Sequence, residues 1–127
     1  MKKLIVIVLL FLFTSCASVD VSPSAFVLDI GVMLQESNNQ YLKGVIELDE
    51  YARDMSMAQN HLAIDKLSPK HSDATMRFIK EVNTMKSVIA DRKINKIDED
   101  MFVVQVKASN ANIQGILANE AVKAQLR

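Results

Sequence analysis

Apolar residues recur at helical spacing through most of this chain, with few residues that would interrupt a helix. Steps of alternately four and three residues place them on one face of an α-helix. Only three glycines and two prolines occur in 127 residues. Three series show the spacing: Tyr41, Val45, Leu48, Ala52, Met55, Gln59 and Leu62; Phe78, Val82, Met85 and Ile89; and Phe102, Val106, Ile113, Leu117, Ala121 and Ala124. The pattern predicts an all-α protein.

Three sites carry the residues that begin helices. Ser22-Pro23 and Ser68-Pro69 each offer a serine for the N-cap and a proline for the first helical position. Val21 and Phe26 have the spacing of a hydrophobic staple across the first of these caps. Asp98 precedes two further acidic residues, which the helix dipole favours in a first turn. These signals predict helix starts at 22, 68 and 98.

The stretch from 23 to 66 is long for one helix of a globular protein. Its uncharged polar cluster, Ser37-Asn38-Asn39-Gln40, is the expected turn. The prediction is a small antiparallel bundle of three or four helices over residues 23–127. If 23–66 stayed unbroken, a long hairpin completing its core against a second chain would be the alternative. A short strand at 101–106 is disfavoured because no second strand is available to pair with it.

The first fifteen residues have the composition of a secretion signal. Lys2 and Lys3 precede ten consecutive apolar residues, 4–13, and Thr14 and Ser15 follow. The apolar run is half of the roughly 20 residues that a membrane-spanning helix needs. We therefore expect residues 1–15 to be a cleaved signal peptide and residues 16–22 to be a short tether.

The end of this signal resembles the lipobox of bacterial lipoproteins. The residues are Leu12-Phe13-Thr14-Ser15-Cys16, with Phe13 where that family usually has leucine. The resemblance implies that diacylglycerol is added to the Cys16 thiol, that signal peptidase II cuts before Cys16, and that the new amino group receives a further acyl chain such as palmitate. The alternative is an ordinary cleaved signal with a cysteine nearby by chance.

The resemblance also implies a location. Aspartate after the cysteine tends to keep such proteins in the inner membrane of Gram-negative bacteria, and here the residue is Ala17. The expectation is attachment to the outer membrane, on its periplasmic side, through the acyl chains on Cys16. In a Gram-positive host the same anchor would place the protein at the cell surface.

Residues suited to catalysis or nucleic-acid binding do not form a recognisable pattern. Cys16 is the only cysteine, no serine lies in a Gly-x-Ser-x-Gly context, and the glycines are isolated. After residues 1–15 are removed, 13 basic and 15 acidic residues remain. This balance gives no basic footprint for nucleic acid. The expectation is a protein that is not an enzyme, uses no cofactor and binds no nucleic acid.

One helical segment holds the only weak candidates for metal ligands. Met55, Met57, His61 and Asp65 lie within eleven residues, and methionine and histidine suit copper. No second cluster supplies further ligands, and methionine commonly fills gaps in a core. We therefore expect no metal site.

An anchored helical domain without catalytic residues favours a binding role. The first hypothesis is an adaptor or assembly factor that binds an envelope protein through a helical face, as pilotins and accessory lipoproteins of secretion systems do. The alternative is an exclusion or immunity lipoprotein, or a bundle that binds a small apolar ligand. A third hypothesis is a phage outer-membrane lysis subunit.

Overall fold

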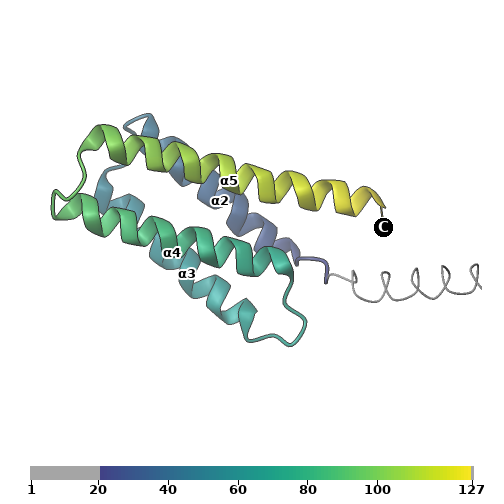
Figure 1. Cartoon of the computed structure of the whole chain (residues 1–127). Coiled ribbons are helices and arrows are strands. Elements are labelled where there is room, and N and C mark those ends of the chain that lie inside the picture. The colour runs from purple at the N-terminus through teal and green to yellow at the C-terminus, as the bar shows by residue number, and fades with distance from the viewer. Residues whose placement is uncertain (1–20, 127) are drawn as a thin grey trace, which may run out of the picture.

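Four helices form an antiparallel bundle in the computed structural model, which describes residues 21–126 (Figure 1). They are α2 (Ala25–Leu42), α3 (Leu48–Lys66), α4 (Asp73–Lys93) and α5 (Glu99–Leu126). Each helix packs on its neighbours in the chain, and α5 closes the bundle against α2. No strand occurs in the described part. The predicted all-α bundle is confirmed, and it has four helices.

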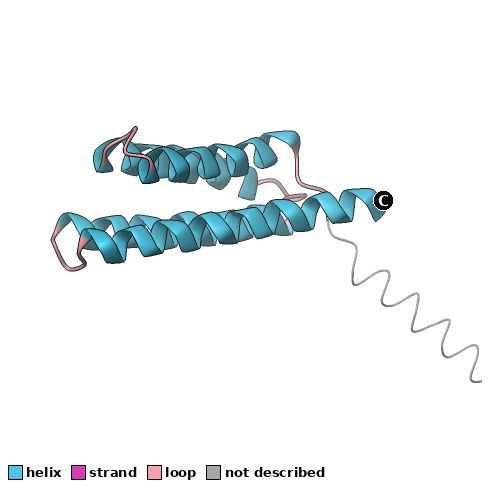
Figure 2. Ribbon diagram, turned by 90° about the horizontal axis from the view of Figure 1, so that it is seen from above, coloured by secondary structure: helices cyan, strands magenta, loops and turns pink. Residues whose placement is uncertain are grey.

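The bundle consists of two similar hairpins, α2–α3 and α4–α5, which form two layers (Figure 2). Buried positions of the first hairpin recur 51 residues later in the second. The pairs are Val27 and Phe78, Leu34 and Met85, Asn38 and Ile89, Tyr51 and Phe102, Met55 and Val106, Ala58 and Ser109, and Leu62 and Ile113. The two hairpins therefore bury equivalent faces against each other.

The loops of the two hairpins have the same conformation. Gly44 and Asn95 have positive φ angles of 73° and 59°. The next amide in each loop donates back across the helix end, from Val45 N to Gln40 O and from Lys96 N to Asp91 O, both at 2.8 Å. This is the Schellman arrangement, which satisfies carbonyl groups left free at a helix end. Glycine and asparagine suit its left-handed position.

One of the three predicted helix starts is correct and two are wrong. Asp98 caps α5, since its Oδ1 accepts the Met101 amide at 2.8 Å. α2 begins after Ser24 instead of Ser22, and α4 begins after Ser72 instead of Ser68. In both cases a second serine lies beyond the proline, and its hydroxyl accepts a first-turn amide. That serine forms the cap, so the serine–proline pair stays in the preceding segment.

The predicted turn at 37–40 is also wrong. α2 continues to Leu42, and the chain turns at 43–47 around Gly44. Ser37 and Asn38 are buried and hydrogen-bonded to other helices. These polar side chains therefore form hydrogen bonds between helices and do not mark a loop. The series predicted from Tyr41 to Leu62 therefore crosses a loop, where Val45 is exposed.

The other two series are confirmed over most of their length. Phe78, Val82, Met85 and Ile89 all lie in the core. In α5 the buried face passes through Phe102, Val106 and Ile113 but then continues to Ile116 and Glu120. Ala121 and Ala124, which the series included, are exposed.

Gly31 allows α2 and α4 to meet across the diagonal of the bundle. A Cβ at this position would lie 2.6 Å from Phe78 Cζ and 3.0 Å from Leu117 Cδ2. The Phe78 ring is completely buried in the core, and Leu117 is partly buried and packs against the core. The absence of a side chain at Gly31 therefore makes room for the Phe78 ring.

Gly31→Ala should lower the free energy of unfolding by about 1–3 kcal/mol, because it overpacks the core. Gly115→Ala is the matched control, since it is also helical and its added Cβ would meet nothing within 4 Å. The control should be neutral or raise stability by up to about 1 kcal/mol, because alanine favours a helix over glycine. Urea denaturation of both variants measures the difference. Equal stability of the two would contradict the proposed packing role.

Candidate functional site

Cys16, the predicted lipidation site, lies outside the described residues. The described chain begins at Val21, five residues later. Val21 enters the bundle at the end that also holds the 67–72 loop and the C-terminal end of α5 (Figure 1). An anchor at Cys16 would therefore join the chain close to this end of the bundle, which we call the tether end.

The four weak metal candidates do not converge. Met55 is buried in the core, whereas Met57 on the same helix is 44% exposed. The His61 ring packs edge-on against Phe26, with centroids 5.4 Å apart. Asp65 Oδ2 accepts a hydrogen bond from Thr75 Oγ1 at 2.6 Å. Among residues 21–126, no three His, Cys, Asp or Glu side chains are grouped so that they could hold a metal ion.

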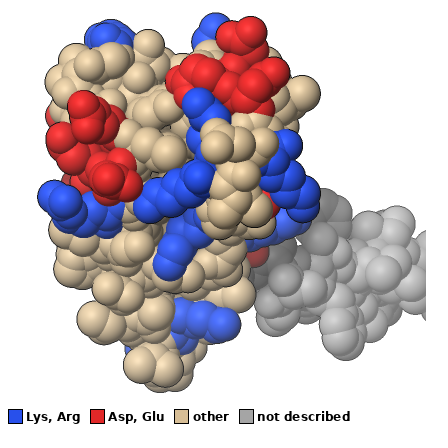
Figure 3. Space-filling model, turned by 90° about the vertical axis from the view of Figure 1, so that its left-hand side faces the viewer, with Lys and Arg blue, Asp and Glu red and all other residues tan. Residues whose placement is uncertain are grey.

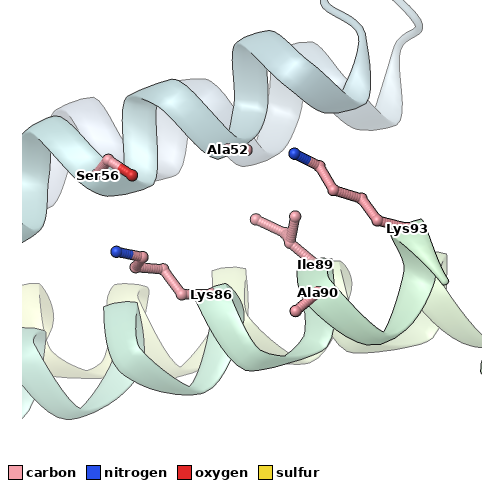
Figure 4. A pocket seen from close by; sticks show the side chains of 6 residues that line it. All are labelled: Ala52, Ser56, Lys86, Ile89, Ala90 and Lys93. Atoms are coloured by element: carbon pink, nitrogen blue, oxygen red, sulfur yellow. The ribbon is translucent and has the colours of Figure 1, made fainter.

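A shallow groove of about 200 Å³ lies between α3 and α4 (Figure 4). Lys86 and Lys93 extend from α4 toward α3 on either side of Ile89. Both ammonium groups have partners within the protein: Lys86 donates to Gln59, and Lys93 Nζ lies 3.4 Å from Asp49 Oδ1. Pockets for small organic ligands usually measure about 300–1,000 Å³. The groove is smaller than that range, and both of its ammonium groups already have partners within the protein.

A hydrogen-bonded polar group lies inside the bundle near the hairpin loops. Tyr51 and Asn38 are fully buried, and the Tyr51 hydroxyl donates to Asn38 Oδ1. Asn38 Nδ2 in turn lies 3.4 Å from Asn110 Oδ1, and Asn110 donates to Asn39. These bonds link α3 to α2 and α2 to α5. Satisfied buried polar groups of this kind fix how helices pair.

The tyrosines of this region remain protonated in the physiological range. Burial raises the pKa of Tyr51 far above its usual value. Burial, followed by a hydrogen bond to Glu99 at 2.9 Å, raises the pKa of Tyr41 to about 12. A tyrosine with a raised pKa is a poor base or nucleophile at neutral pH. The arrangement favours a structural role for both hydroxyl groups.

Tyr51→Phe should lower the free energy of unfolding by about 1–3 kcal/mol, because it leaves the buried Asn38 carbonyl without its donor. Adding Asn38→Ile should recover most of this loss. The double variant then has the apolar pair found at the equivalent positions, Ile89 and Phe102. A double-mutant cycle by urea denaturation measures the coupling. Additive losses would contradict the proposed hydrogen bond.

The outer face of α5 is apolar along almost its whole length. A helix on the surface of a bundle is normally apolar toward the core and polar toward water. α5 has its buried face and also an exposed stripe, which we call the α5 outer stripe. The stripe has steps of three and four residues and contains no charged residue: Met101, Val104, Ala108, Ala111, Gly115, Ala118 and Val122.

The larger side chains of the α5 outer stripe are well exposed. Met101 is 49% exposed, Val104 56% and Val122 55%. The residues between them are small, so a second helix could approach the α5 backbone closely. This stripe was not predicted from the sequence, because only one apolar series was followed through 102–124. Counting exposed-face positions from Met101 at the same spacing would have found it.

Comparison with known proteins gives no relative from which a role could be transferred. No protein family, curated protein or solved structure matches this chain. Within residues 21–126, no helix is both long and apolar enough to cross a membrane. The surfaces of the bundle itself are therefore the source of functional evidence.

Proposed function

We propose that this protein is a non-enzymatic lipoprotein that acts as an adaptor or assembly factor for a cell-envelope complex. Acyl chains on Cys16 hold it at the outer membrane, on the periplasmic side. The α5 outer stripe binds an apolar helix of the envelope partner. The observation that carries the binding role is that α5 is apolar on two faces, while the bundle buries only one of them.

The geometry of the stripe supports a helical partner. From Met101 to Val122 a helix rises about 32 Å, at 1.5 Å per residue. Alternating steps of three and four keep the stripe on one side of α5 over this length. Small residues in its middle, Ala108 to Ala118, leave a shallow track between larger ends. A partner helix with larger apolar side chains at matching spacing would fill this track.

The borders of the stripe add specificity to the proposed contact. Asn112 and Gln114 lie beside its centre, and both already form hydrogen bonds within the bundle, to Glu81 and Gln35. Uncharged amides at the border of an apolar track tolerate burial better than charged groups do. The region therefore suits an interface with an apolar centre and a polar rim.

The proposed anchor predicts how a Cys16→Ser variant behaves. Without the thiol, diacylglycerol cannot be attached, so the variant should accumulate as an unprocessed or mis-sorted precursor. Intact-mass measurement and membrane fractionation of both proteins compare their processing and location. An unchanged mass pattern and membrane attachment in Cys16→Ser would contradict the lipoprotein assignment.

Val104→Glu tests the α5 outer stripe. A carboxylate within this apolar contact would be buried without a partner, so recovery of the cross-linked partner should fall at least about tenfold. Met57→Glu is the matched control, because Met57 is a similarly exposed apolar residue that lies on α3, outside the α5 outer stripe. Both variants should keep a helical circular dichroism spectrum.

Cross-linking in cells followed by mass spectrometry of co-purified proteins gives the measurement. One dominant envelope protein, lost in Val104→Glu and kept in Met57→Glu, is the expected result. Equal recovery in both variants would show that another surface binds the partner. Recovery of lipid alone would contradict the adaptor role and favour the exclusion, immunity or apolar-ligand alternative.

A further inference from the structure

We infer that the tether end of the bundle is itself a membrane-docking surface that rests on anionic phospholipid. The contact consists of Ile64, Leu67 and Leu126, which enter the interface, with Lys66 and Lys70 beside them. This inference rests on the proposed acyl anchor at Cys16. It adds that the folded domain touches the bilayer directly and stands in one orientation.

The exposed apolar residues of the tether end are unusually accessible. Leu67 is 84% exposed, Leu126 is 83% and Ile64 is 67%. They come from the end of α3, the following loop and the end of α5, and these segments lie at one end of the bundle in both ribbon views (Figures 1 and 2). Moving such exposed leucine and isoleucine side chains from water into the boundary between headgroups and acyl chains lowers the free energy.

The length of the tether places this end near the bilayer. Cys16 and Val21 are five residues apart, and a fully extended chain spans at most about 3.6 Å per residue. The start of the bundle is therefore within about 18 Å of an anchored Cys16. A bilayer surface is the one partner that the anchor itself would bring to this end of the molecule.

The charges of the tether end match an anionic surface. Lys66 and Lys70 are exposed on either side of Leu67, and within residues 21–126 neither forms an ion pair. Of the nearby carboxylates, Asp73 pairs with Arg77 at 2.8 Å. Asp65, whose Oδ2 accepts from Thr75, keeps its charge, and Lys66 and Lys70 together outweigh it. Lysines beside an inserting leucine can keep their ammonium groups at the headgroup level.

The opposite end of the bundle has a different character. Figure 3 shows groups of acidic side chains there, separated by basic ones. Its exposed acidic residues are Glu47, Asp49, Glu50, Asp98, Glu99 and Asp100, against the basic residues Lys43, Arg92, Lys93 and Lys96. The acidic excess would be repelled by anionic lipid. The difference in charge between the two ends therefore favours docking on anionic lipid through the tether end.

A single-cysteine labelling experiment tests the contact. Cys16 is the only cysteine and is blocked when acylated, so Leu67→Cys gives the full processed protein one free thiol for an environment-sensitive fluorophore. Ile94→Cys is the matched control, because Ile94 is 73% exposed in the loop at the opposite end. Both proteins are reconstituted in vesicles of phosphatidylethanolamine and phosphatidylglycerol that contain spin-labelled lipid.

We expect at least threefold stronger quenching by spin-labelled lipid at position 67 than at position 94. Lys66→Glu with Lys70→Glu, added to the Leu67→Cys protein, should lower that quenching at least twofold. Equal quenching at 67 and 94 would overturn the docking surface. Quenching unaffected by the charge reversal would overturn the role of anionic lipid.

The intact mass of each labelled protein separates this inference from the proposed anchor. A mass that includes the acyl chains, together with a water-exposed label at 67, would overturn the docking surface alone. A mass without acyl chains would overturn the anchor, and the docking surface with it. Circular dichroism confirms that each variant has kept its helices before quenching is compared.

Discussion

The contact between Gly31 and the Phe78 ring sets how closely the two hairpins can approach. It joins α2 to α4 across the bundle, where side chains on both helices would normally keep the backbones apart. At the hairpin-loop end the two layers are linked by Asn110, which bonds Asn38 and Asn39, and Tyr51 bonds Asn38 within the first layer. Close packing at one level and hydrogen bonds at another therefore fix the pairing of two otherwise similar hairpins.

The fold class and one of the three helix starts were predicted correctly from the sequence alone. Phe78 to Ile89 has an uninterrupted apolar spacing and became core, and Asp98 has no competing cap residue near it. The predicted turn at 37–40 was wrong because its polar residues have partners far away in the sequence. Ser37 and Asn38 are polar because their partners are Asp54 and Tyr51 on the next helix, and local composition does not contain that information. The candidate surfaces were equally hard to predict, because an exposed apolar residue is recognised only when the core is known.

The tether end and the α5 outer stripe support each other as parts of one arrangement. If the tether end rests on lipid, the helices stand away from the membrane and the stripe extends outward from it. A helix of 28 residues spans about 42 Å. A partner helix bound along the stripe would then lie roughly parallel to the membrane normal, and the acidic end of the bundle would point away from the lipid. The proposed anchor at Cys16, five residues before Val21, would allow this orientation without a long flexible linker.

The two hairpins differ in helix length at the tether end of the bundle. By the 51-residue relation, the last residue of α3, Lys66, corresponds to Leu117, yet α5 continues to Leu126. The corresponding residues, 67–75, form the loop after α3 and the start of α4, so the additional turns of α5 have no helical counterpart in the first hairpin. They bury Glu120, whose Oε1 lies 3.4 Å from Lys123 Nζ, and they carry Val122 of the stripe and the exposed Leu126. The extension adds Ala118 and Val122 to the stripe and supplies Leu126, one of the three apolar residues proposed to enter lipid, so part of each proposed contact lies in the segment that breaks the repeat.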